Sequence, residues 1–369
     1  MAAREDASGA FEASLFGVLR TVLRLTRQDP RFLVRVLRVL RQQRRGARSR
    51  AASEARGVHV PPFVIYSVTG RCNLECAGCY ASILHRSNRP ELSDERVARL
   101  LGEARDLGVS VMLLAGGEPL LRRGLVDLVS AVPEILFLLF TNAHLLDDAA
   151  IERLRRTPHV IPVLSLEGNE QETDERRGRG TYARVREAMA RLRARRVFFG
   201  TSTTLTSENL ELATSEPRLR ELVTCGCRLF YFINYVPVQA GTDHLQPSPE
   251  QVAELERRLA HHRRTLAALF IAFPHDEVAL GGCLAAGKGF LHVNAYGDVE
   301  PCPFSPYSDV NVVETSLEQA LASPLFRKII SSDVTLDEGD GRCALWKRRE
   351  WVASLVKSGT EADKTGGRP

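Results

Sequence analysis

Three cysteines have the spacing needed to hold a metal cluster together. Cys72, Cys76 and Cys79 are separated by three and then two residues, and they directly follow an apolar run at 63–68 that predicts a strand. A loop this short can direct three thiolates to three corners of one iron–sulfur cube, which leaves the fourth iron without a protein ligand. Structural metal sites are normally closed by a fourth protein ligand, whereas reactive sites keep an open position. The spacing therefore predicts a reactive iron centre.

The order C-x-x-x-C-x-x-C-Y at 72–80 resembles the signature of the radical S-adenosylmethionine (SAM) enzymes. The resemblance implies that Cys72, Cys76 and Cys79 bind a [4Fe–4S] cluster, that SAM chelates the open iron, and that Tyr80 lies beside the adenine. It also implies that reduction of the cluster cleaves SAM to a 5′-deoxyadenosyl radical, which abstracts hydrogen from a substrate. Zinc is the alternative, but a zinc site usually pairs two C-x-x-C halves or Cys with His, and the sequence near this loop contains no second half.

The sequence after this loop alternates between strand and helix patterns. Short apolar runs occur at 63–68, 109–114, 135–140, 160–166, 198–205 and 228–236. Helical patterns separate them at 94–107, 121–132, 149–155, 182–194 and 209–223, and Ser93 is expected to cap the first of these helices. Repeated βα units imply a parallel sheet with covered faces. We therefore predict an α/β fold built on a partial (βα)6 TIM-like barrel.

The chain is expected to divide into five segments. These are a basic amphipathic helical segment with a linker at 1–57, the radical SAM partial barrel at 58–245, a connecting helix and strand at 246–282, a small twitch-like auxiliary-cluster region (a β-hairpin plus a helix) at 283–345, and a C-terminal tail at 346–369.

Polar motifs follow the predicted strands in order, at the end of the barrel where chemistry gathers. The resemblance to radical SAM enzymes implies that these motifs bind SAM: the GGEP segment would contact its amino group, Ser165 and Glu167 its ribose and polar part, and Arg177 its carboxylate. A plain turn, a cap or a surface charge is the alternative for each motif taken alone. The residues concerned are Gly116, Gly117, Glu118, Pro119, Thr141, Asn142, Ser165, Glu167 and Arg177.

A second group of cysteines lies near the C-terminus. Cys283, Gly297 and Cys302 form a C-x13-G-x4-C pattern, and Cys343 follows after a helix-like segment at 317–330. The pattern is similar to the opening of SPASM and twitch extensions, which implies an auxiliary [4Fe–4S] cluster held by Cys283, Cys302 and Cys343. Three thiolates again leave one iron open unless another residue or a substrate fills it. The alternative is a set of reduced core cysteines.

Composition is that of a soluble protein in a reducing compartment. Of the 369 residues 44% are hydrophobic and 26% charged, and eight cysteines without a secretory leader argue against a disulfide scaffold. No stretch approaches the roughly 20 apolar residues that cross a bilayer. We therefore expect a cytoplasmic protein.

The N-terminal segment is strongly basic. Residues 1–57 contain thirteen arginines and five acidic residues, and apolar positions recur at helical spacing at 15–23 and 32–40, followed by a polar linker at 41–56. Arginine-striped helices suit an anionic surface, so we expect peripheral contact with the inner face of the membrane through residues 11–45, or with an acidic partner. Packing on the enzyme's own body is the alternative. Nucleic acid is not expected, because the basic segment lacks aromatic residues that stack on bases.

The reaction that follows from the resemblance is radical modification of a peptide or protein, or maturation of a cofactor or natural product. A membrane-associated lipid or quinone-type substrate is one alternative. An iron–sulfur electron-transfer protein or a zinc-binding protein without SAM turnover is another. The resemblance further implies a ferredoxin or flavodoxin as reductant.

Overall fold

The computed structural model describes residues 24–27, 31–278 and 281–356. Its centre is a curled nine-stranded sheet in the order β7-β6-β5-β4-β3-β2-β1-β8-β9, in which β1 to β8 run parallel to their neighbours and β9 is antiparallel to β8. The strands are β1 (Phe63–Thr69), β2 (Val111–Gly116), β3 (Leu136–Thr141), β4 (Val160–Ser165), β5 (Gly200–Leu205), β6 (Leu229–Asn234), β7 (Leu269–Phe273), β8 (Phe290–Val293) and β9 (Val299–Glu300).

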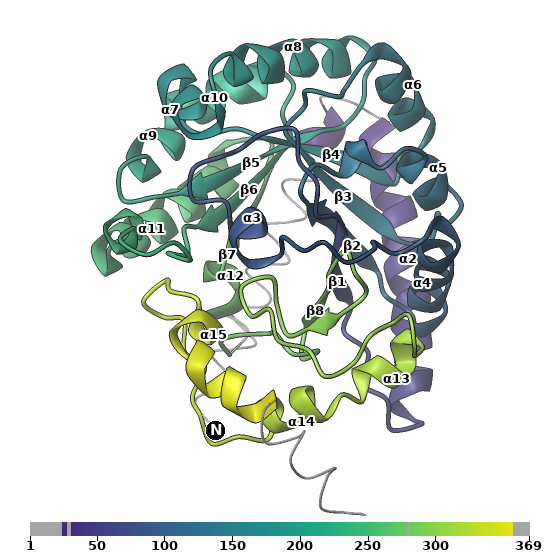
Figure 1. The fold of residues 1–369 in the computed structure, drawn as a ribbon. Helices are drawn as coiled ribbons and strands as arrows, with labels where there is room; N and C mark the ends of the chain where they lie inside the picture. Colours follow the sequence, from purple (N-terminus) through teal and green to yellow (C-terminus); the bar gives the residue numbers. More distant parts are fainter. Residues whose placement is uncertain (1–23, 28–30, 279–280, 357–369) are drawn as a thin grey trace, which may run out of the picture.

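Helices cover the outer face of this half-barrel, and Figure 1 shows them outside the curled sheet. The helices in the described part of the chain, of which α3 lies at the mouth of the half-barrel, are α2 (Arg31–Glu54), α3 (Tyr80–Leu84), α4 (Asp94–Leu107), η1 (Pro119–Leu121), α5 (Leu125–Ser130), α6 (Asp148–Arg156), α7 (Glu170–Arg177), α8 (Thr181–Ala194), α9 (Leu210–Ala213), α10 (Glu216–Thr224), η2 (Asp243–Leu245), α11 (Pro249–Thr265), α12 (His275–Val278), α13 (Leu317–Leu321), α14 (Pro324–Ile330) and α15 (Ala344–Lys347). Residues 349–356 are also helical.

The predicted partial barrel is confirmed. The six expected strands are β1 to β6, and the expected helix and strand at 246–282 are α11 and β7. Ser93 caps α4 as predicted, because its side chain accepts a hydrogen bond from the Arg96 amide. The helix expected at 209–223 is broken into α9 and α10, since Pro217 in the first turn of α10 favours a new helix start.

The predicted C-terminal hairpin is present as β8 and β9, and it is part of the barrel sheet. β8 lies beside β1 in parallel register, with Tyr66 paired to Val293. The helical segment expected at 317–330 is divided into α13 and α14, where Ser323 caps the second helix and Pro324 begins it. The extension therefore prolongs the sheet next to the strand that precedes the first cysteine loop.

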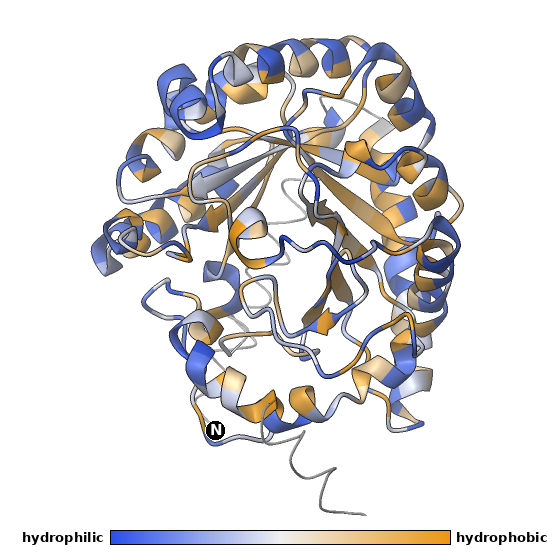
Figure 2. Ribbon diagram, in the orientation of Figure 1, coloured by the Kyte–Doolittle hydropathy of each residue, from blue (hydrophilic) through white to orange (hydrophobic). Residues whose placement is uncertain are grey.

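Strand burial explains the continuous apolar runs. The outer face of the sheet packs against the helices through residues such as Tyr66, Leu114 and Phe137, while a separate cluster including Leu113, Leu138, Val163, Leu229 and Tyr231 lies on the other face. Sheets covered on both faces need apolar residues at successive positions. Figure 2 shows the helices polar on their outer sides and apolar toward the sheet.

The linker predicted at 41–56 is wrong in its secondary structure, because α2 continues to Glu54. Arginine, glutamine and alanine favour helix, and packing stabilises the segment further. Arg50 donates hydrogen bonds of 2.6 Å to the Gly108 carbonyl and to Ser110 Oγ, and Phe32 stacks on Phe198 with ring centroids 5.6 Å apart. Thus α2 packs on the barrel, as the alternative interpretation held, while the apolar run at 15–23 lies outside the described residues.

The search for membrane-spanning segments covered the described parts of the chain. Within them, no helix combines the length and the apolar character needed to cross a bilayer.

Candidate functional site

The first cysteine loop connects β1 to α3. Cys72 is exposed, Cys76 and Cys79 are partly buried, and Cys79 is the N-cap of α3. Burial raises the pKa of the Cys72 and Cys76 thiols, and at Cys76 the guanidinium of Arg177 opposes this rise. The three sulfurs interact electrostatically with one another, so the structure brings them together as the spacing predicts.

The Gly116–Gly117 turn lies directly against the cysteine loop. The Gly117 amide donates to the Thr69 carbonyl at 2.7 Å, and the Glu118 amide donates to the Arg71 carbonyl at 2.8 Å. A Cβ atom on Gly117 would lie 1.9 Å from the Arg71 carbonyl oxygen, which the backbone could not accommodate. The second glycine is therefore required by this close backbone approach.

The Glu118 carboxylate is engaged inside the protein. It is buried and accepts hydrogen bonds from Thr141 Oγ1 at 2.8 Å, from the Asn142 amide at 2.8 Å and from the Leu120 amide at 3.1 Å. Burial raises its pKa, and these hydrogen bonds oppose the rise. Glu118 thus fixes the turn after β3, while its expected contact with the SAM amino group stays a prediction.

The Thr141–Asn142–Ala143 turn faces the cysteines. Asn142 Nδ2 donates to Asn73 Oδ1 at 2.8 Å and lies 4.0 Å from Cys72 Sγ. Ala143 has a φ of 69°, a left-handed conformation that glycine adopts more readily than alanine.

A buried ion-pair cluster forms after β4. Arg176 Nη1 and Arg177 Nη2 lie 2.6 Å and 2.7 Å from the same oxygen, Glu167 Oε1, and the Thr204 amide donates to Glu167 Oε2 at 3.2 Å. Burial raises the pKa of Glu167, but the two arginines outweigh it, so the net shift is downward. The Arg176 carbonyl also accepts a hydrogen bond of 2.8 Å from the Ala77 amide, which fastens the cysteine loop to the end of α7.

Arg176 is a residue that the sequence interpretation missed. Both arginines line the cavity described below, whereas Glu167 and Pro119 are not among its lining residues. Glu167 acts instead as the anchor that holds the two guanidinium groups at the wall. Its expected ribose contact stays a prediction, and the adjacent second arginine was the available sequence signal for Arg176.

Tyr80 connects the two cysteine groups. Its ring packs against Phe304, two residues after Cys302, with centroids 4.9 Å apart, and lies edge-on to His85 at 6.1 Å. Burial raises the pKa of the Tyr80 hydroxyl, and the charges of Cys79 and Cys302 add to this effect.

The second cysteine group is more deeply buried. Cys283 and Cys302 are buried and Cys343 is partly buried. Burial raises the pKa of Cys302 well above its ordinary range, and a hydrogen bond with Cys343 adds to the shift; burial likewise raises the pKa of Cys283, with Glu338 as the next cause. The three thiols therefore meet although 60 positions of sequence separate the first from the last.

Two glutamates that the sequence interpretation missed lie among these thiols. Glu277 in α12 and Glu338 in the loop before α15 are buried, and their carboxyl groups contact each other. Burial raises the pKa of Glu277, with the neighbouring Glu338 carboxyl adding to the shift, and burial also raises the pKa of Glu338. No motif marks them, because only the fold brings α12 to this loop.

A chain of hydrogen bonds positions the hairpin beside β1. Ser67 Oγ lies 2.8 Å from His292 Nε2, and His292 Nδ1 lies 2.7 Å from Glu300 Oε2. Asn294 Nδ2 donates to the other oxygen of Glu300 at 2.7 Å. This network fixes β9 two residues before Cys302.

One cavity of about 250 Å3 is lined by all six cysteines. Gly116, Gly117, Glu118, Thr141, Asn142, Ser165, Arg177 and Tyr80 also line it, together with Glu277 and Glu338. Aromatic and apolar side chains from the strands form much of the remaining wall: Phe63, Ile65, Leu113, Phe140, Tyr231, Ile233, Phe273 and Phe290. The cavity can therefore hold a cofactor between two thiol groups and exclude water from an apolar wall.

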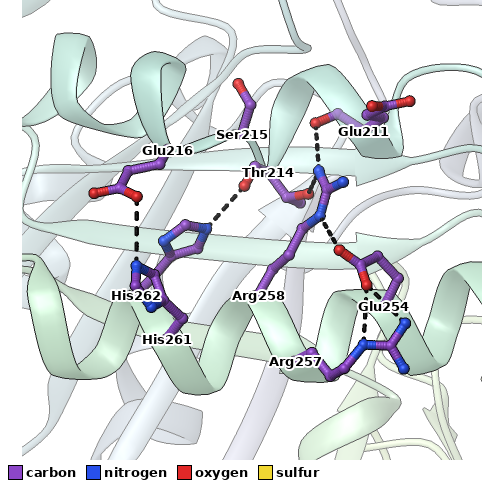
Figure 3. Close-up of a pocket in the computed structure, with 9 residues that line it drawn as sticks. All are labelled: Glu211, Thr214, Ser215, Glu216, Glu254, Arg257, Arg258, His261 and His262. Carbon is purple, nitrogen blue, oxygen red and sulfur yellow. Dashed lines mark hydrogen bonds and ion pairs between the residues drawn. The ribbon is translucent and has the colours of Figure 1, made fainter.

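Three further pockets in the described part of the chain contain none of these six cysteines. The one in Figure 3 lies between α9, α10 and α11, where Arg258 pairs with Glu254 at 2.7 Å and His262 lies 2.9 Å from the Thr214 carbonyl. The Arg258–Glu254 pair lies within α11, and the His262 contact joins α11 to the end of α9. Cys227 is buried, with its pKa raised by burial to about 11 and its sulfur 3.7 Å from Thr201 Oγ1, and Cys225 is partly buried.

Comparison with known proteins defines the class. Residues 66–213 match the radical SAM superfamily, a range that contains the first cysteine loop and the motifs after β2, β3 and β4. The chain is a radical SAM enzyme, of the class whose cofactors are SAM and a [4Fe–4S] cluster. The interpretations without SAM turnover are not supported.

Two relatives and one solved structure illustrate the similarity. An AdoMet-dependent heme synthase from Methanosarcina barkeri is 25% identical over 325 residues, covering 80% of this chain and 91% of the relative. A PqqA peptide cyclase from Ruegeria pomeroyi is 29% identical over 264 residues, covering 66% and 68%. The fold is similar to that of Streptococcus suis SuiB bound to its precursor peptide SuiA, with a TM-score of 0.64, 20% identity and coverage of 80% and 73%.

Proposed function

We propose that the cavity is the active site, with Cys72, Cys76 and Cys79 holding the SAM-binding cluster and Cys283, Cys302 and Cys343 holding an auxiliary [4Fe–4S] cluster. The observation that carries the proposal is that both thiol groups line one cavity. Thiolates are the ligands of iron–sulfur cubes, so both sets of residues fit the groups they would hold. When bound, the reduced first cluster cleaves SAM and supplies a 5′-deoxyadenosyl radical.

In this proposal, the residues around the first cysteine loop bind and orient SAM. The Arg177 guanidinium suits the SAM carboxylate, since its planar donors can make a bidentate contact, and Glu167 fixes that guanidinium from behind. The backbone of Gly116 and Gly117 borders the cavity without side chains, and Tyr80 offers a flat ring to the adenine. The apolar wall keeps water from a reactive intermediate.

The substrate is a peptide side chain, or one group of a larger cofactor precursor. Relatives named as a heme synthase and a peptide cyclase act on substrates of these two kinds, and SuiB binds a precursor peptide.

Anaerobic reconstitution tests this proposal. The protein should bind about eight iron atoms per chain, as two cubes require, and should convert SAM to 5′-deoxyadenosine when dithionite is added. Candidate peptides with deuterated side chains should transfer deuterium to 5′-deoxyadenosine. A content of four iron atoms per chain would contradict the proposed auxiliary cluster. SAM that stays unchanged would contradict the proposed activity.

The reductant is proposed to be a ferredoxin or flavodoxin that approaches the exposed side of the first cysteine loop. Arg71, Arg86 and Arg89 are exposed around this loop, where they favour an acidic partner surface. The rate of cluster reduction by flavodoxin should fall with rising salt, and Arg71→Glu and Arg86→Glu together should slow it further. An equal rate for the variant would exclude this docking face.

Peripheral membrane contact through residues 11–45 is proposed on the outer face of α2. Leu33, Val34, Leu37 and Leu40 are exposed there, Val34 at 61%. Exposed arginines accompany them at positions 38, 41, 44, 45 and 48, which suits an anionic bilayer surface.

Vesicle sedimentation tests the membrane proposal. Full-length protein should sediment with phosphatidylglycerol vesicles, and Leu33→Ser with Leu37→Ser should reduce this binding. Leu212→Ser, which changes an exposed apolar residue elsewhere, is the matched control. Equal sedimentation of all three proteins would contradict the proposal.

A further inference from the structure

Two buried carboxyl groups lie beside the second cysteine group, and no sequence motif marks them. Cys283, Cys302 and Cys343 supply three thiolates, so a cube held by them alone would keep one open iron. Glu277 and Glu338 line the same cavity and are only 4% and 2% exposed. This arrangement is unlike the first cysteine loop, where the nearby Glu118 is fully hydrogen-bonded.

Both glutamates carry an unpartnered oxygen. Among the described residues, Glu338 Oε2 and Glu277 Oε1 are buried without a hydrogen-bond partner. A buried carboxylate oxygen left without a partner costs free energy, and such groups in a native fold call for an ion or another partner. Each oxygen belongs to a side chain that borders the cavity.

Glu338 is better placed than Glu277 to bind iron. Its Oε1 accepts a hydrogen bond of 3.1 Å from the Ala344 amide, next to Cys343, and its carboxylate contacts the side chain of Cys283. Glu338 therefore lies between two of the three thiols, with Oε1 fixed and Oε2 free. Glu277 contacts the Leu284 backbone and the Glu338 carboxyl, and it interacts with Cys343 through charge.

The loop that carries Glu338 is held at both ends. The Cys283 amide donates to the Leu336 carbonyl at 3.3 Å, and Asn234 at the end of β6 donates to the Gly341 carbonyl at 3.0 Å. A Cβ atom on Gly282 would lie 2.9 Å from the Leu336 carbonyl oxygen, so the two segments approach closely. The position of Glu338 relative to Cys283 and Cys343 is thus set by the fold.

We propose that Glu338 is the fourth protein ligand of the auxiliary cluster, binding iron through Oε2. Carboxylate is an established oxygen ligand for metals, and it binds as the anion. This inference rests on the proposed auxiliary cluster at the three cysteines. It closes that cluster to substrate and makes it an electron acceptor.

Cyanide binding tests the assignment with a readout independent of turnover. The parent protein is the full chain with Cys72, Cys76 and Cys79 changed to alanine, so that only the auxiliary cluster remains. It should bind about four iron atoms, and its reduced electron paramagnetic resonance (EPR) signal should not change with cyanide. Glu338→Ala in this parent opens the iron, and cyanide should then shift the signal. Glu277→Ala, the matched control, should stay insensitive.

Each other outcome has a definite meaning. A cyanide shift in the parent, or a shift in Glu277→Ala alone, would overturn the assignment of Glu338. If Glu338→Ala fails to retain iron, Glu338→Cys should restore about four iron atoms with a cyanide-insensitive signal, and a sensitive signal would overturn the proposal. A parent that folds but holds no iron would overturn the auxiliary cluster itself, which is a failure of the proposed function rather than of the ligand choice alone.

Discussion

The two cysteine groups occupy the same cavity but are built in opposite ways. The first is one short loop in which Cys72 is exposed and the sulfurs lie beside the arginines of α7. The second is assembled from three distant segments, is buried, and lies beside two carboxyl groups. A site with cationic neighbours suits the anionic carboxylate of SAM, whereas a site with its own acids suits a closed cluster.

The first cysteine group is more open to solvent than the second, although both line one cavity. The exposed loop leaves an approach for a reductant and an open iron for SAM. The buried trio is reached from the loop across Tyr80 and Phe304, whose rings are in contact. In the proposed function, a substrate bound between the two groups would meet the radical on one side and an electron acceptor on the other.

Removing a ligand of the first group should have the largest effect. In Cys76→Ala, we expect 5′-deoxyadenosine formation to fall to the background level, because SAM loses the cluster that cleaves it. Chromatography of the product measures this, and Cys225→Ala, which changes a partly buried cysteine away from the cavity, is the matched control. If Cys76→Ala still formed 5′-deoxyadenosine, the first cysteine loop could not hold the cluster that cleaves SAM.

Removing a proposed ligand of the second group should separate SAM cleavage from substrate modification. In Cys302→Ala, we expect SAM cleavage to persist while substrate modification is lost, since only electron acceptance fails. Iron should fall from about eight to about four atoms per chain. Loss of SAM cleavage equal to that in Cys76→Ala would contradict the division of labour between the groups.

Breaking the ion-pair cluster of the first group should mainly affect stability. Glu167→Ala leaves Arg176 and Arg177 without their shared anion, and removing one partner of a buried ion pair costs about 3–5 kcal/mol. Denaturant unfolding should show this loss, together with weaker SAM binding. Glu152→Ala, which removes an exposed partner of Arg155 and Arg156, should change stability little.

The same cluster predicts a pH dependence. The arginines hold the pKa of Glu167 below its ordinary value of 4.5, so the ion pair stabilises the fold above that pH and the contribution is lost as pH falls through the lower, folded value. Between pH 7 and pH 3, the unchanged protein should therefore lose more free energy of unfolding than Glu167→Ala. Parallel curves would show that Glu167 is not ionised in the fold.

The smallest expected effect concerns the hydrogen bond from Asn234 to the Gly341 carbonyl, which holds the loop of the second group. Asn234→Ala leaves the Gly341 carbonyl without its donor, at a cost of about 1–3 kcal/mol, and loosens the loop that bears Glu338 and Cys343. Auxiliary iron should be lost faster to a chelator than in the unchanged protein. Asn209→Ala, a buried asparagine that donates to the Thr204 carbonyl, should leave the rate of iron loss unchanged.

Local chemistry made the first group predictable from sequence. Its ligands lie within one loop, and each strand ends at a short motif, so order along the chain translates directly into proximity at one end of the barrel. The strand runs were equally readable, because strands buried on both faces need continuous apolar residues.

The rest depends on tertiary contacts that have no local pattern. Glu277 lies six residues before Cys283 and Glu338 five before Cys343, but only the fold turns both toward the same cavity. Arg176 was missed because the sequence does not show that both adjacent arginines pair with Glu167. The linker predicted at 41–56 was wrong because a polar, arginine-rich sequence is also a good helix when a surface is available, and Arg50 with Gly46 supplies the contact with Gly108.

The EPR response of the first cluster to SAM tests the central claim most directly. In the protein with Cys283, Cys302 and Cys343 changed to alanine, one reduced cluster should remain. Adding SAM should shift its signal and yield 5′-deoxyadenosine. A signal identical with and without SAM, and no nucleoside product, would contradict the account.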